Sequence, residues 1–471
     1  MAKIGLLGLY LELYDIRSPG MREKIDGFYE NIALEFEKRG IDVIRQPICR
    51  LEDEFKTAVK TFESSGADAL VTLHLAYSPS LESSDVLMGT ALPIYILNTT
   101  PDYDFRVDEE YNAISYNHGI HGVQDMCNLL LRNGREFAIE TGHWRESDAI
   151  DRLCRRILKK DDKSAMTDSV AAPDFSGKLV RVGIIGKPFE GMGDFRVGFS
   201  ELHKKLGIEV VECDHKLLKE FIAGVSNDEI EDEIRHNRME FDDRLTESDA
   251  YAANLRSCLG VRKWIEDQEL DAFTVNFLDV DKNKGLASVP FYEASKQMSS
   301  GRGYAGEGDA MTAGLVAMLM RITKDVSFTE IFCPDWSEDT LFLSHMGEMN
   351  IDLCKENPVL HEKDYVFSDV EVNPVVFSGE FKPGNAHLVN ISPSKGGGFT
   401  LIIAPVAMVS TNKVKNGVRG WMKPQMPIEE FLSRYSSYGG THHSALVYGD
   451  FSDEILTLGR YLGCRIVNLS R

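Results

Sequence analysis

The amino-acid sequence predicts an α/β protein, with two Rossmann-like α/β domains of mostly parallel sheet followed by a C-terminal β-rich, barrel-like domain. Two observations support this fold class. Short apolar segments alternate with helical segments from residue 3 to residue 277, which is typical of right-handed βαβ units. After residue 345, strand-like segments follow one another with glycine-rich turns and without helices, which favours an antiparallel sheet or barrel.

The first α/β domain is expected in residues 1–175. We predict strands at 3–7, 42–45, 69–73 and 93–97, and helices at 21–38, 52–64 and 146–160. A further helix is expected to begin near Gln124, after a histidine- and glycine-containing segment at 117–122. Residues 161–175 are rich in Lys, Asp, Ser, Ala and Pro, a composition that predicts a domain boundary. No G-x-G-x-x-G motif follows the first strand, which argues against a dinucleotide site there.

The second α/β domain is expected in residues 176–326 and the β-rich domain in residues 327–471. For the second domain we predict strands at 179–186, 209–212 and 271–277, and helices at 200–206, 227–244 and 248–268. For the third we predict strands at 365–370, 373–380, 386–392 and 399–409, and a final βα unit around His443. Ligands meet parallel sheets at the carboxyl ends of strands, where the loop with Met192 and the strand end at Phe277 lie.

Composition and charge narrow the class of protein. A length of 471 residues is enough for about three domains of roughly 150 residues. The net charge of −22 argues against binding to nucleic acid or to an anionic membrane. The apolar run at residues 4–8 is too short for a signal peptide or a membrane span, so we expect a cytoplasmic protein. The eight cysteines are scattered without CxxC spacing, which predicts reduced thiols.

Acidic and histidine residues suggest a divalent-metal site. Glu307 lies in a glycine-rich turn before an apolar helical segment at 310–322, and Glu330 and His345 follow at the edges of the next elements. A later glycine turn adds His442 and His443. Two carboxylates with imidazole nitrogens suit Mn²⁺, Co²⁺ or Mg²⁺ better than a soft metal.

Plainer interpretations of these residues stay open. Glu307 and Asp309 could be first-turn acids of the following helix, and single histidines are often surface or core residues. Because successive side chains of an extended segment point to opposite faces, we expect at most one of His442 and His443 to ligate. Cys333 lies between Glu330 and His345 and could line the site, but the local sequence offers it no base.

Five ordered motifs then identify a resemblance. They are GYAGEGDAMTAGL (303–315), SFTE (327–330), SHMGE (344–348), GGTHHS (439–444) and AFTVNF (272–277). In order and approximate spacing they resemble the L-arabinose isomerase family, within the L-fucose/L-arabinose isomerase superfamily, and the similarity extends across nearly the whole chain.

The resemblance implies a Mn²⁺-dependent aldose–ketose isomerase that works through a cis-enediol and forms a homo-oligomer with active sites at subunit contacts. The metal ligands it implies are Glu307, Glu330, His345 and His443. The two glutamates would also be the acid/base pair, without a decision on which takes the first proton. His121 matches a histidine that a neighbouring subunit contributes in the family. The remaining substrate-binding candidates are Tyr14, Met192, Phe277 and His442.

Two segments depart from the family pattern, and both border the sugar in the family. Residues 11–14 read Leu-Glu-Leu-Tyr in place of Gln-His-Leu-Tyr, and residues 330–335 read Glu-Ile-Phe-Cys-Pro-Asp in place of Glu-Asp-Tyr-Thr-Tyr-His. Such losses of polar contacts shift sugar selectivity. The alternatives are therefore an epimerase, an isomerase of a different sugar (deoxy, branched, tetrose or acid), and a non-catalytic sugar-binding protein.

Overall fold

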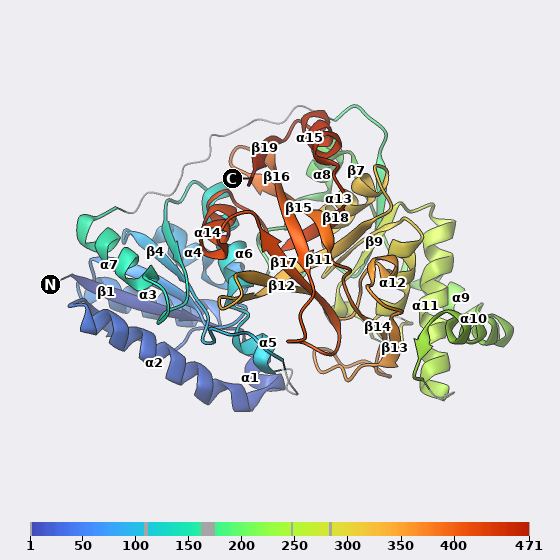
Figure 1. Ribbon diagram of the computed structural model, residues 1–471, viewed down its shortest axis with the longest axis horizontal. Helices are drawn as coiled ribbons and strands as arrows, with labels where there is room; N and C mark the ends of the chain where they lie inside the picture. The colour runs from blue at the N-terminus through green and yellow to red at the C-terminus, as the bar shows by residue number, and fades with distance from the viewer. Residues whose placement is uncertain (1, 108–111, 162–174, 246–247, 282–284, 471) are drawn as a thin grey trace.

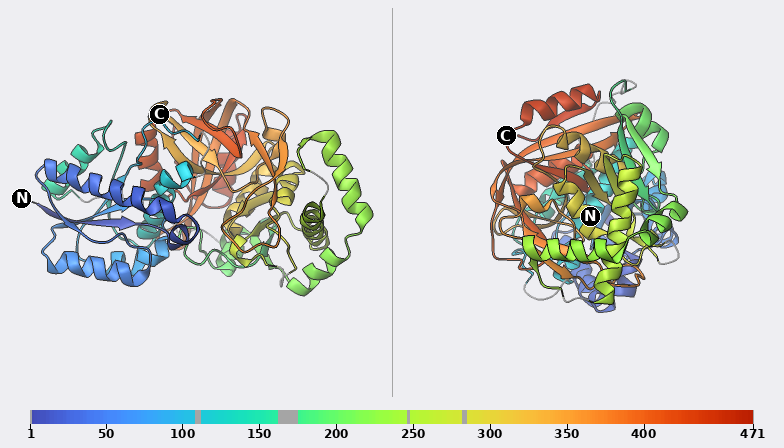
Figure 2. Two further views of the ribbon diagram at one scale, coloured as in Figure 1. Left: turned by 90° about the horizontal axis from the view of Figure 1, so that it is seen from below. Right: turned by 90° about the vertical axis from the view of Figure 1, so that its right-hand side faces the viewer.

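The computed structural model contains three sheets that follow one another along the chain. It describes residues 2–107, 112–161, 175–245, 248–281 and 285–470. The N-terminal sheet (blue to cyan) lies at one end of the molecule, the central sheet with α9, α10 and α11 (green to yellow) at the other, and the C-terminal strands (orange to red) between them (Figures 1 and 2). The expected fold class, two parallel-sheet α/β regions followed by an antiparallel β-rich region, is confirmed.

The N-terminal sheet has five parallel strands in the order β2-β1-β3-β4-β5. Its strands are β1 (Lys3–Leu9), β2 (Asp42–Arg45), β3 (Ala69–His74), β4 (Ile94–Asn98) and β5 (Ala138–Thr141). Its helices are α1 (Glu12–Arg17), α2 (Arg22–Lys38), α3 (Glu52–Ser64), α4 (Ser80–Gly89), α5 (Asn112–Tyr116), α6 (Gly119–Arg132) and α7 (Ala149–Lys159). The apolar faces of α2 and α7 pack with one side of the sheet and those of α3, α4 and α6 with the other.

One prediction for this region needs correction. Helix α6 begins at Gly119 and not near Gln124, so His121 lies in its first turn. Gly119 and Gly122 allow this first turn to pack directly against His74, because a Cβ at either position would lie within 2.4 Å of a His74 atom. Strand β5 and helix α4 were not predicted. The predicted boundary stretch lies partly outside the described residues, which resume at 175 after α7.

The central sheet has four parallel strands in the order β10-β9-β6-β7. They are β6 (Val180–Ile185), β7 (Ile208–Glu212), β9 (Ala272–Val275) and β10 (Gly303–Gly306), with helices α8 (Phe199–Leu206), α9 (His215–Ala223), α10 (Asn227–Glu240), α11 (Asp249–Asp267), α12 (Phe291–Ser299) and α13 (Ala310–Met320). Every residue of α13 is buried, because this helix lies between the central sheet and the C-terminal strands. Its sequence accordingly has no polar face.

A buried ion cluster joins α10, α11 and α12. The Arg262 guanidinium on α11 donates hydrogen bonds to Glu233 at 2.9 and 3.0 Å and to Glu293 at 2.9 to 3.2 Å. Burial opposes ionisation of Glu233, but Arg262 outweighs it and lowers the pKa of Glu233 to about 2. The single charge of Arg262 thus balances Glu233, whereas burial outweighs it at Glu293 and raises the pKa of that carboxyl.

The C-terminal region forms a closed six-stranded antiparallel barrel, in the order β16-β15-β18-β11-β12-β17, with β17 pairing back to β16. These strands are β11 (Val326–Asp335), β12 (Thr340–Ser344), β15 (Gly384–Ser394), β16 (Gly398–Val409), β17 (Val418–Pro424) and β18 (His443–Tyr448). Outside the barrel lie β8 (Asp242–Asp243), β13 (Val359–Glu362), β14 (Val375–Glu380), β19 (Arg465–Asn468), α14 (Ile428–Ser437) and α15 (Ser452–Tyr461).

The prediction of a strand at 365–370 is wrong. The strand in this part of the chain is β13, which ends at Glu362, and residues 365–370 run without regular pairing. Their apolar side chains have a different role, because Tyr365 packs edge-on against Phe291 and Phe367. Strands β11, β12 and β17 were not predicted, although they complete the barrel. In the described part of the chain no helix is both long and apolar enough to cross a membrane.

Candidate metal centre

Two buried glutamates mark the centre of a pocket between the three sheets. Glu307 directly follows β10, and Glu330 lies on β11. Glu307 has a φ of +62° and is the one buried residue among the described non-glycine residues with positive φ. Its carbonyl accepts a hydrogen bond of 2.9 Å from the Phe189 amide, which fixes this turn. Strained backbone of this kind is concentrated at functional sites.

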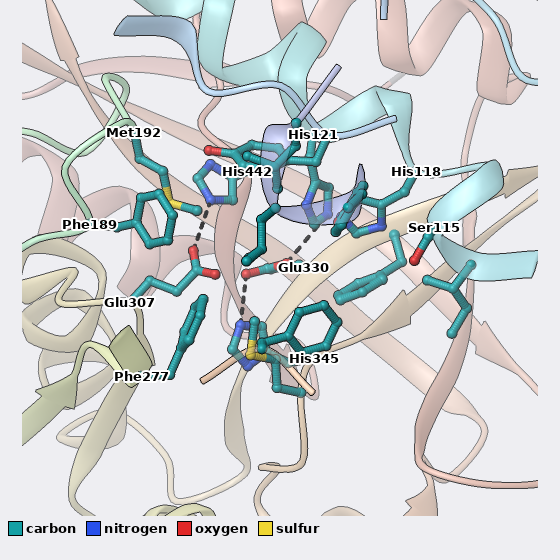
Figure 3. Close-up of a pocket in the computed structure, with 18 residues that line it drawn as sticks. Ser115, His118, His121, Phe189, Met192, Phe277, Glu307, Glu330, His345 and His442 are labelled. Atoms are coloured by element: carbon teal, nitrogen blue, oxygen red, sulfur yellow. Dashed lines mark ion pairs between the residues drawn. The ribbon is translucent and has the colours of Figure 1, made fainter. Parts of the chain in front are cut away.

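Three histidine rings, those of His345, His442 and His443, surround the glutamates, and Figure 3 shows His345 and His442 beside them. His443 lies directly opposite Glu330 on β18, and its Nε2 is 2.7 Å from Glu330 Oε1 and 3.4 Å from Glu307 Oε2. His345 Nε2 lies 3.1 Å from Glu330 Oε1, just after the end of β12. His442 Nε2 lies 3.6 Å from Glu307 Oε2. One oxygen or nitrogen from each of Glu307, Glu330, His442 and His443 lies within 4.8 Å of the others.

A second carboxylate holds the far side of each ring. The Nδ1 distances are 2.6 Å from His345 to Glu348 Oε1, 2.8 Å from His442 to Asp194 Oδ2, and 2.9 Å from His443 to Asp309 Oδ2. In each pair the imidazole Nδ1–H donates to the carboxylate, which leaves the Nε2 lone pair facing the glutamates. This is the arrangement by which proteins orient histidines as metal ligands.

The charge of the cluster is unbalanced. Five carboxylates (Asp194, Glu307, Asp309, Glu330 and Glu348) share a buried volume with three imidazoles. Burial lowers the pKa of His345, but Glu348 and Glu330 outweigh it and raise it to about 10, and Asp194 likewise raises the pKa of His442 to about 10. The surroundings therefore favour positive charge at this point.

The buried atoms that face one another test whether a cation fits. Glu307 Oε2, Glu330 Oε1, His442 Nε2 and His443 Nε2 are all buried, and their polar neighbours lie within the cluster itself, where imidazole nitrogens and carboxylate oxygens are 2.7 to 3.6 Å apart. Buried polar atoms are ordinarily satisfied, so four such atoms turned toward one another call for a shared partner. A divalent cation satisfies them and offsets the negative charge. Oxygen and imidazole nitrogen donors fit Mn²⁺, Co²⁺ or Mg²⁺.

His442 differs from what strand alternation predicts. The expectation was that His442 and His443 point to opposite faces, yet their ring centroids are 4.3 Å apart and both Nε2 atoms face Glu307. The reason is that β18 begins at His443, so His442 is in a bend and is not bound by the alternation of an extended strand. The structure thus brings five candidate ligands together, including all four that the sequence suggested.

The N-terminal domain closes the site from the other side. His121 Nε2, from the first turn of α6, lies 3.4 Å from Glu330 Oε2 of the same chain. His118 lies beside His121 with ring centroids 3.8 Å apart and ring planes tilted by 58°, and Tyr77 packs against both His121 and His442. The sequence had singled out His121, but it had not assigned His118 or Tyr77 to the site.

A buried carboxylate joins this domain to the metal centre. Asp125, on α6, accepts hydrogen bonds from the amide and hydroxyl of Ser80 and from the amides of Gly193 and Asp194. Asp194 in turn accepts from the His442 backbone amide and ring. One continuous chain of hydrogen bonds therefore runs through all three domains to His442.

The other predicted residues fall in two groups. Tyr14, Met192 and Phe277 all line the pocket. Cys333 does not line it. Its thiol is buried 3.7 Å from the Ile114 carbonyl oxygen, and burial raises its pKa well above the usual range.

Comparison with known proteins gives this geometry a family context. Residues 200–325 match the family model of the L-arabinose isomerase central domain. The chain is 25% identical to the L-arabinose isomerase of Pediococcus pentosaceus over 407 residues. This alignment covers 80% of this chain and 78% of the Pediococcus protein. The L-arabinose isomerase of Anoxybacillus flavithermus is 21% identical over 485 residues, 95% of this chain and 90% of its own. The chain is thus similar to L-arabinose isomerases over most of its length, at low identity.

The extent of the similarity bears on the site. The region of the family model includes Glu307 and ends before Glu330, whereas the alignment with the Anoxybacillus flavithermus enzyme covers 95% of this chain. Among solved structures, an Escherichia coli transcriptional repressor, AscG, aligns over 59% of this chain and 78% of its own with 13% identity. Its TM-score of 0.17 carries no argument about this fold.

Proposed function

We propose that this protein is a divalent-metal-dependent aldose–ketose isomerase that acts on a neutral sugar. The observation that carries the proposal is the convergence of buried carboxylate oxygens and imidazole nitrogens, from Glu307, Glu330, His442 and His443, in the wall of a pocket. The similarity to L-arabinose isomerases over most of the chain supports the reaction class.

The two glutamates suit the proton transfer of this reaction. Isomerisation moves hydrogen between C1 and C2 of an open-chain sugar, and a carboxylate must remove a weakly acidic proton beside a carbonyl. Glu307 and Glu330 both face the pocket, one from the central domain and one from the barrel. One would take the proton to give a cis-enediol and return it to the neighbouring carbon, while the other serves the hydroxyl oxygens.

The histidines would hold the cation in place. His345, His442 and His443 present Nε2, and their carboxylate partners keep the rings in the required orientation. A bound Mn²⁺, or Co²⁺ or Mg²⁺, supplies Lewis acidity that stabilises negative charge on the sugar oxygens. His121 and His118 lie beside Glu330 and would bind the sugar's hydroxyl groups.

The pocket favours a neutral sugar. None of the described residues that line it is a lysine or an arginine. A phosphate or carboxylate on the sugar would therefore approach Glu307 and Glu330 without a cationic side chain to pair with it, which is unfavourable in a buried site. This argues against the sugar-acid alternative.

Deuterium exchange tests the proposal. Protein stripped of metal by a chelator is incubated with a panel of aldoses and ketoses in D₂O, with and without Mn²⁺, and followed by NMR. We expect Mn²⁺-dependent incorporation of deuterium at C1 or C2 together with aldose–ketose conversion, abolished in Glu307→Gln and Glu330→Gln. Glu231→Gln, on the exposed side of α10, is the matched control and should retain activity.

Other outcomes separate the alternatives. Exchange at a carbon whose configuration inverts, without a ketose product, would indicate an epimerase. Sugar binding without exchange, in protein that binds no divalent metal, would indicate a non-catalytic sugar-binding protein. Asp309→Asn gives an independent check of the metal centre, because loss of the carboxylate behind His443 should weaken Mn²⁺ binding about 10- to 100-fold.

A homo-oligomer and a cytoplasmic location remain predictions from the resemblance and the sequence. The resemblance implied that His121 serves a neighbouring subunit. In this structure His121 faces Glu330 of its own chain, and we propose that each chain supplies its own His121.

A further inference from the structure

A second cleft lies outside the barrel and shares no lining residue with the pocket of the metal centre. It lies against β13, β14 and β17, and in this part of the fold β14 pairs with both of the other strands (Figure 1). Its volume of about 530 Å³ is within the range of small-molecule sites. The cleft is therefore large enough for a ligand of its own.

The cleft reverses the charge balance of the chain. The whole sequence has 74 acidic and 52 basic residues. The described residues that line the cleft instead include four cationic side chains and two carboxylates, and the cations are Arg244, Lys355, Lys415 and Arg419. A cleft lined by one sign of charge raises the local concentration of small ions of the opposite sign. This cleft therefore favours a small anion.

Two of the four cations are free to meet such an anion. Arg244 and Lys355 each have one acidic neighbour, at 2.8 and 3.8 Å. In the described part of the chain, no carboxylate oxygen lies within 4 Å of a side-chain nitrogen of Lys415 or Arg419. Burial lowers the pKa of the Arg419 guanidinium, although the more distant Glu380 raises it. The protein thus compensates the charge of Arg419 only in part.

Paired backbone fixes the positions from which two of the cations extend. The Arg419 carbonyl accepts a hydrogen bond of 2.8 Å from the Phe381 amide, directly after the end of β14. The Lys355 amide donates a hydrogen bond of 2.8 Å to the carbonyl of Glu380, the last residue of the same strand. Because these backbone positions are already set in the folded chain, less order is lost when both charges meet one anion.

The other lining residues indicate the kind of anion. None of the described lining residues is Phe, Tyr or Trp, and Val359 alone has an aliphatic side chain, so a nucleobase or an acyl chain would find no matching surface. Asn357 and Asn416 offer amide groups, and Glu380 Oε1 is buried without a hydrogen-bond partner among the described residues. Carboxylate oxygens accept hydrogen bonds from hydroxyls, whereas arginine and lysine bind phosphate oxygens.

We propose that this cleft binds a phosphorylated polyol, a compact molecule that combines a phosphate monoester with several hydroxyl groups. Arg419 and Lys415 hold the phosphate, and a hydroxyl donates to Glu380. His361 takes no part, because both of its ring nitrogens are already hydrogen-bonded within the protein, at 2.5 and 2.8 Å. This binding site goes beyond the isomerase reaction and does not depend on it.

Calorimetry with a polyol phosphate tests the proposal. Full-length protein, stripped of metal by a chelator, is titrated in phosphate-free buffer of low ionic strength with D-sorbitol 6-phosphate, which has no carbonyl and cannot be isomerised. Sorbitol, inorganic phosphate and sulfate are the comparison ligands. We expect sorbitol 6-phosphate to bind at least about tenfold tighter than each of the three, because it alone can use both the cations and the hydroxyl acceptors.

Two variants locate the binding. Arg419→Met and Lys415→Met each remove one cation and should raise the Kd of sorbitol 6-phosphate about tenfold or more. Lys415 is exposed, so its replacement leaves the packing of the fold intact. Lys60→Met, on the exposed side of α3, removes the same charge from the N-terminal domain and is the matched control, with a Kd expected within about twofold of the wild type.

The contrary outcomes are distinct. Absence of saturable binding of sorbitol 6-phosphate, or an unchanged Kd in both Arg419→Met and Lys415→Met, would overturn the cleft as a binding site. Equal affinity for sorbitol 6-phosphate and sulfate would show general attraction of anions and overturn the assignment to a phosphorylated polyol. None of these measurements uses bound metal or turnover, so their failure would leave the proposed function intact.

Discussion

A methyl group added at Gly306 would displace a candidate metal ligand. Gly306 is the last residue of β10, directly before Glu307, and its φ is not positive, so an alanine backbone is acceptable there. The added Cβ would lie 2.5 Å from His345 Cε1 and 2.9 Å from Nε2, whereas ordinary contact begins at 3.4 Å. The ring must therefore withdraw by about 1 Å, because atoms closer than van der Waals contact repel steeply.

The ring has little freedom to withdraw. Its Nδ1 is held by Glu348 at 2.6 Å, and Phe328 packs edge-on against it with ring centroids 4.8 Å apart. We expect Gly306→Ala to weaken Mn²⁺ binding about 10- to 100-fold, as loss of ligand orientation does. A misplacement of about 1 Å should also lower kcat/KM by about 100-fold.

Calorimetric titration of metal-free protein with Mn²⁺ measures the first effect, and the isomerase assay measures the second. Gly27→Ala is the matched control, because a Cβ there meets nothing within 4 Å and the residue lies exposed on α2. Thermal unfolding without metal shows whether Gly306→Ala folds. Mn²⁺ affinity within about twofold of the wild type, in a folded variant, would refute the placement of His345 as a constrained ligand.

Three further predictions concern the chain's assembly and stability. Co-expressed His121→Ala and Glu330→Gln chains should not complement each other, because the two residues meet within one chain; recovery of about a quarter of the wild-type activity would show that subunits share sites. Arg262→Met should lower the free energy of unfolding by about 3–5 kcal/mol in urea titrations, because it leaves the two carboxylates on α10 and α12 unpaired; a loss below about 1 kcal/mol would contradict this. Burial lowers the pKa of His74 in the folded state to about 3. Below about pH 6.5 the unfolded chain therefore binds a proton at this histidine and the folded chain does not. The free energy of unfolding then falls by up to about 1.4 kcal/mol for each pH unit. His74→Asn should therefore lose less stability between pH 7 and pH 4.5 than the wild type does, and an equal loss would refute this account.

Local sequence patterns predicted most of the parallel sheets. Apolar residues recur at regular spacing in helix α2 and in strands β1, β2 and β3. This local pattern was enough to predict their approximate bounds. The barrel was predicted only as a class. Its closure depends on pairing between β16 and β17 and on β11 lying between β12 and β18, which are long-range contacts that no local pattern specifies.

The site shows the same division. Residue type and motif order singled out Glu307 and His443, and the structure brings them within 3.4 Å. The carboxylate behind His442 was missed because Asp194 is 248 residues away in the chain. Glu348 could have been found, since it follows His345 by three residues within one motif.

The hydrogen-bond chain from Asp125 to His442 ties the orientation of a candidate metal ligand to the docking of the N-terminal domain. The Asp194 loop gains its support from α6 only once the N-terminal domain has docked on the other two. A chain whose C-terminal barrel has formed, but whose N-terminal domain is still undocked, lacks the support that orients His442. We therefore expect the complete set of candidate ligands to be in place only in the fully assembled fold.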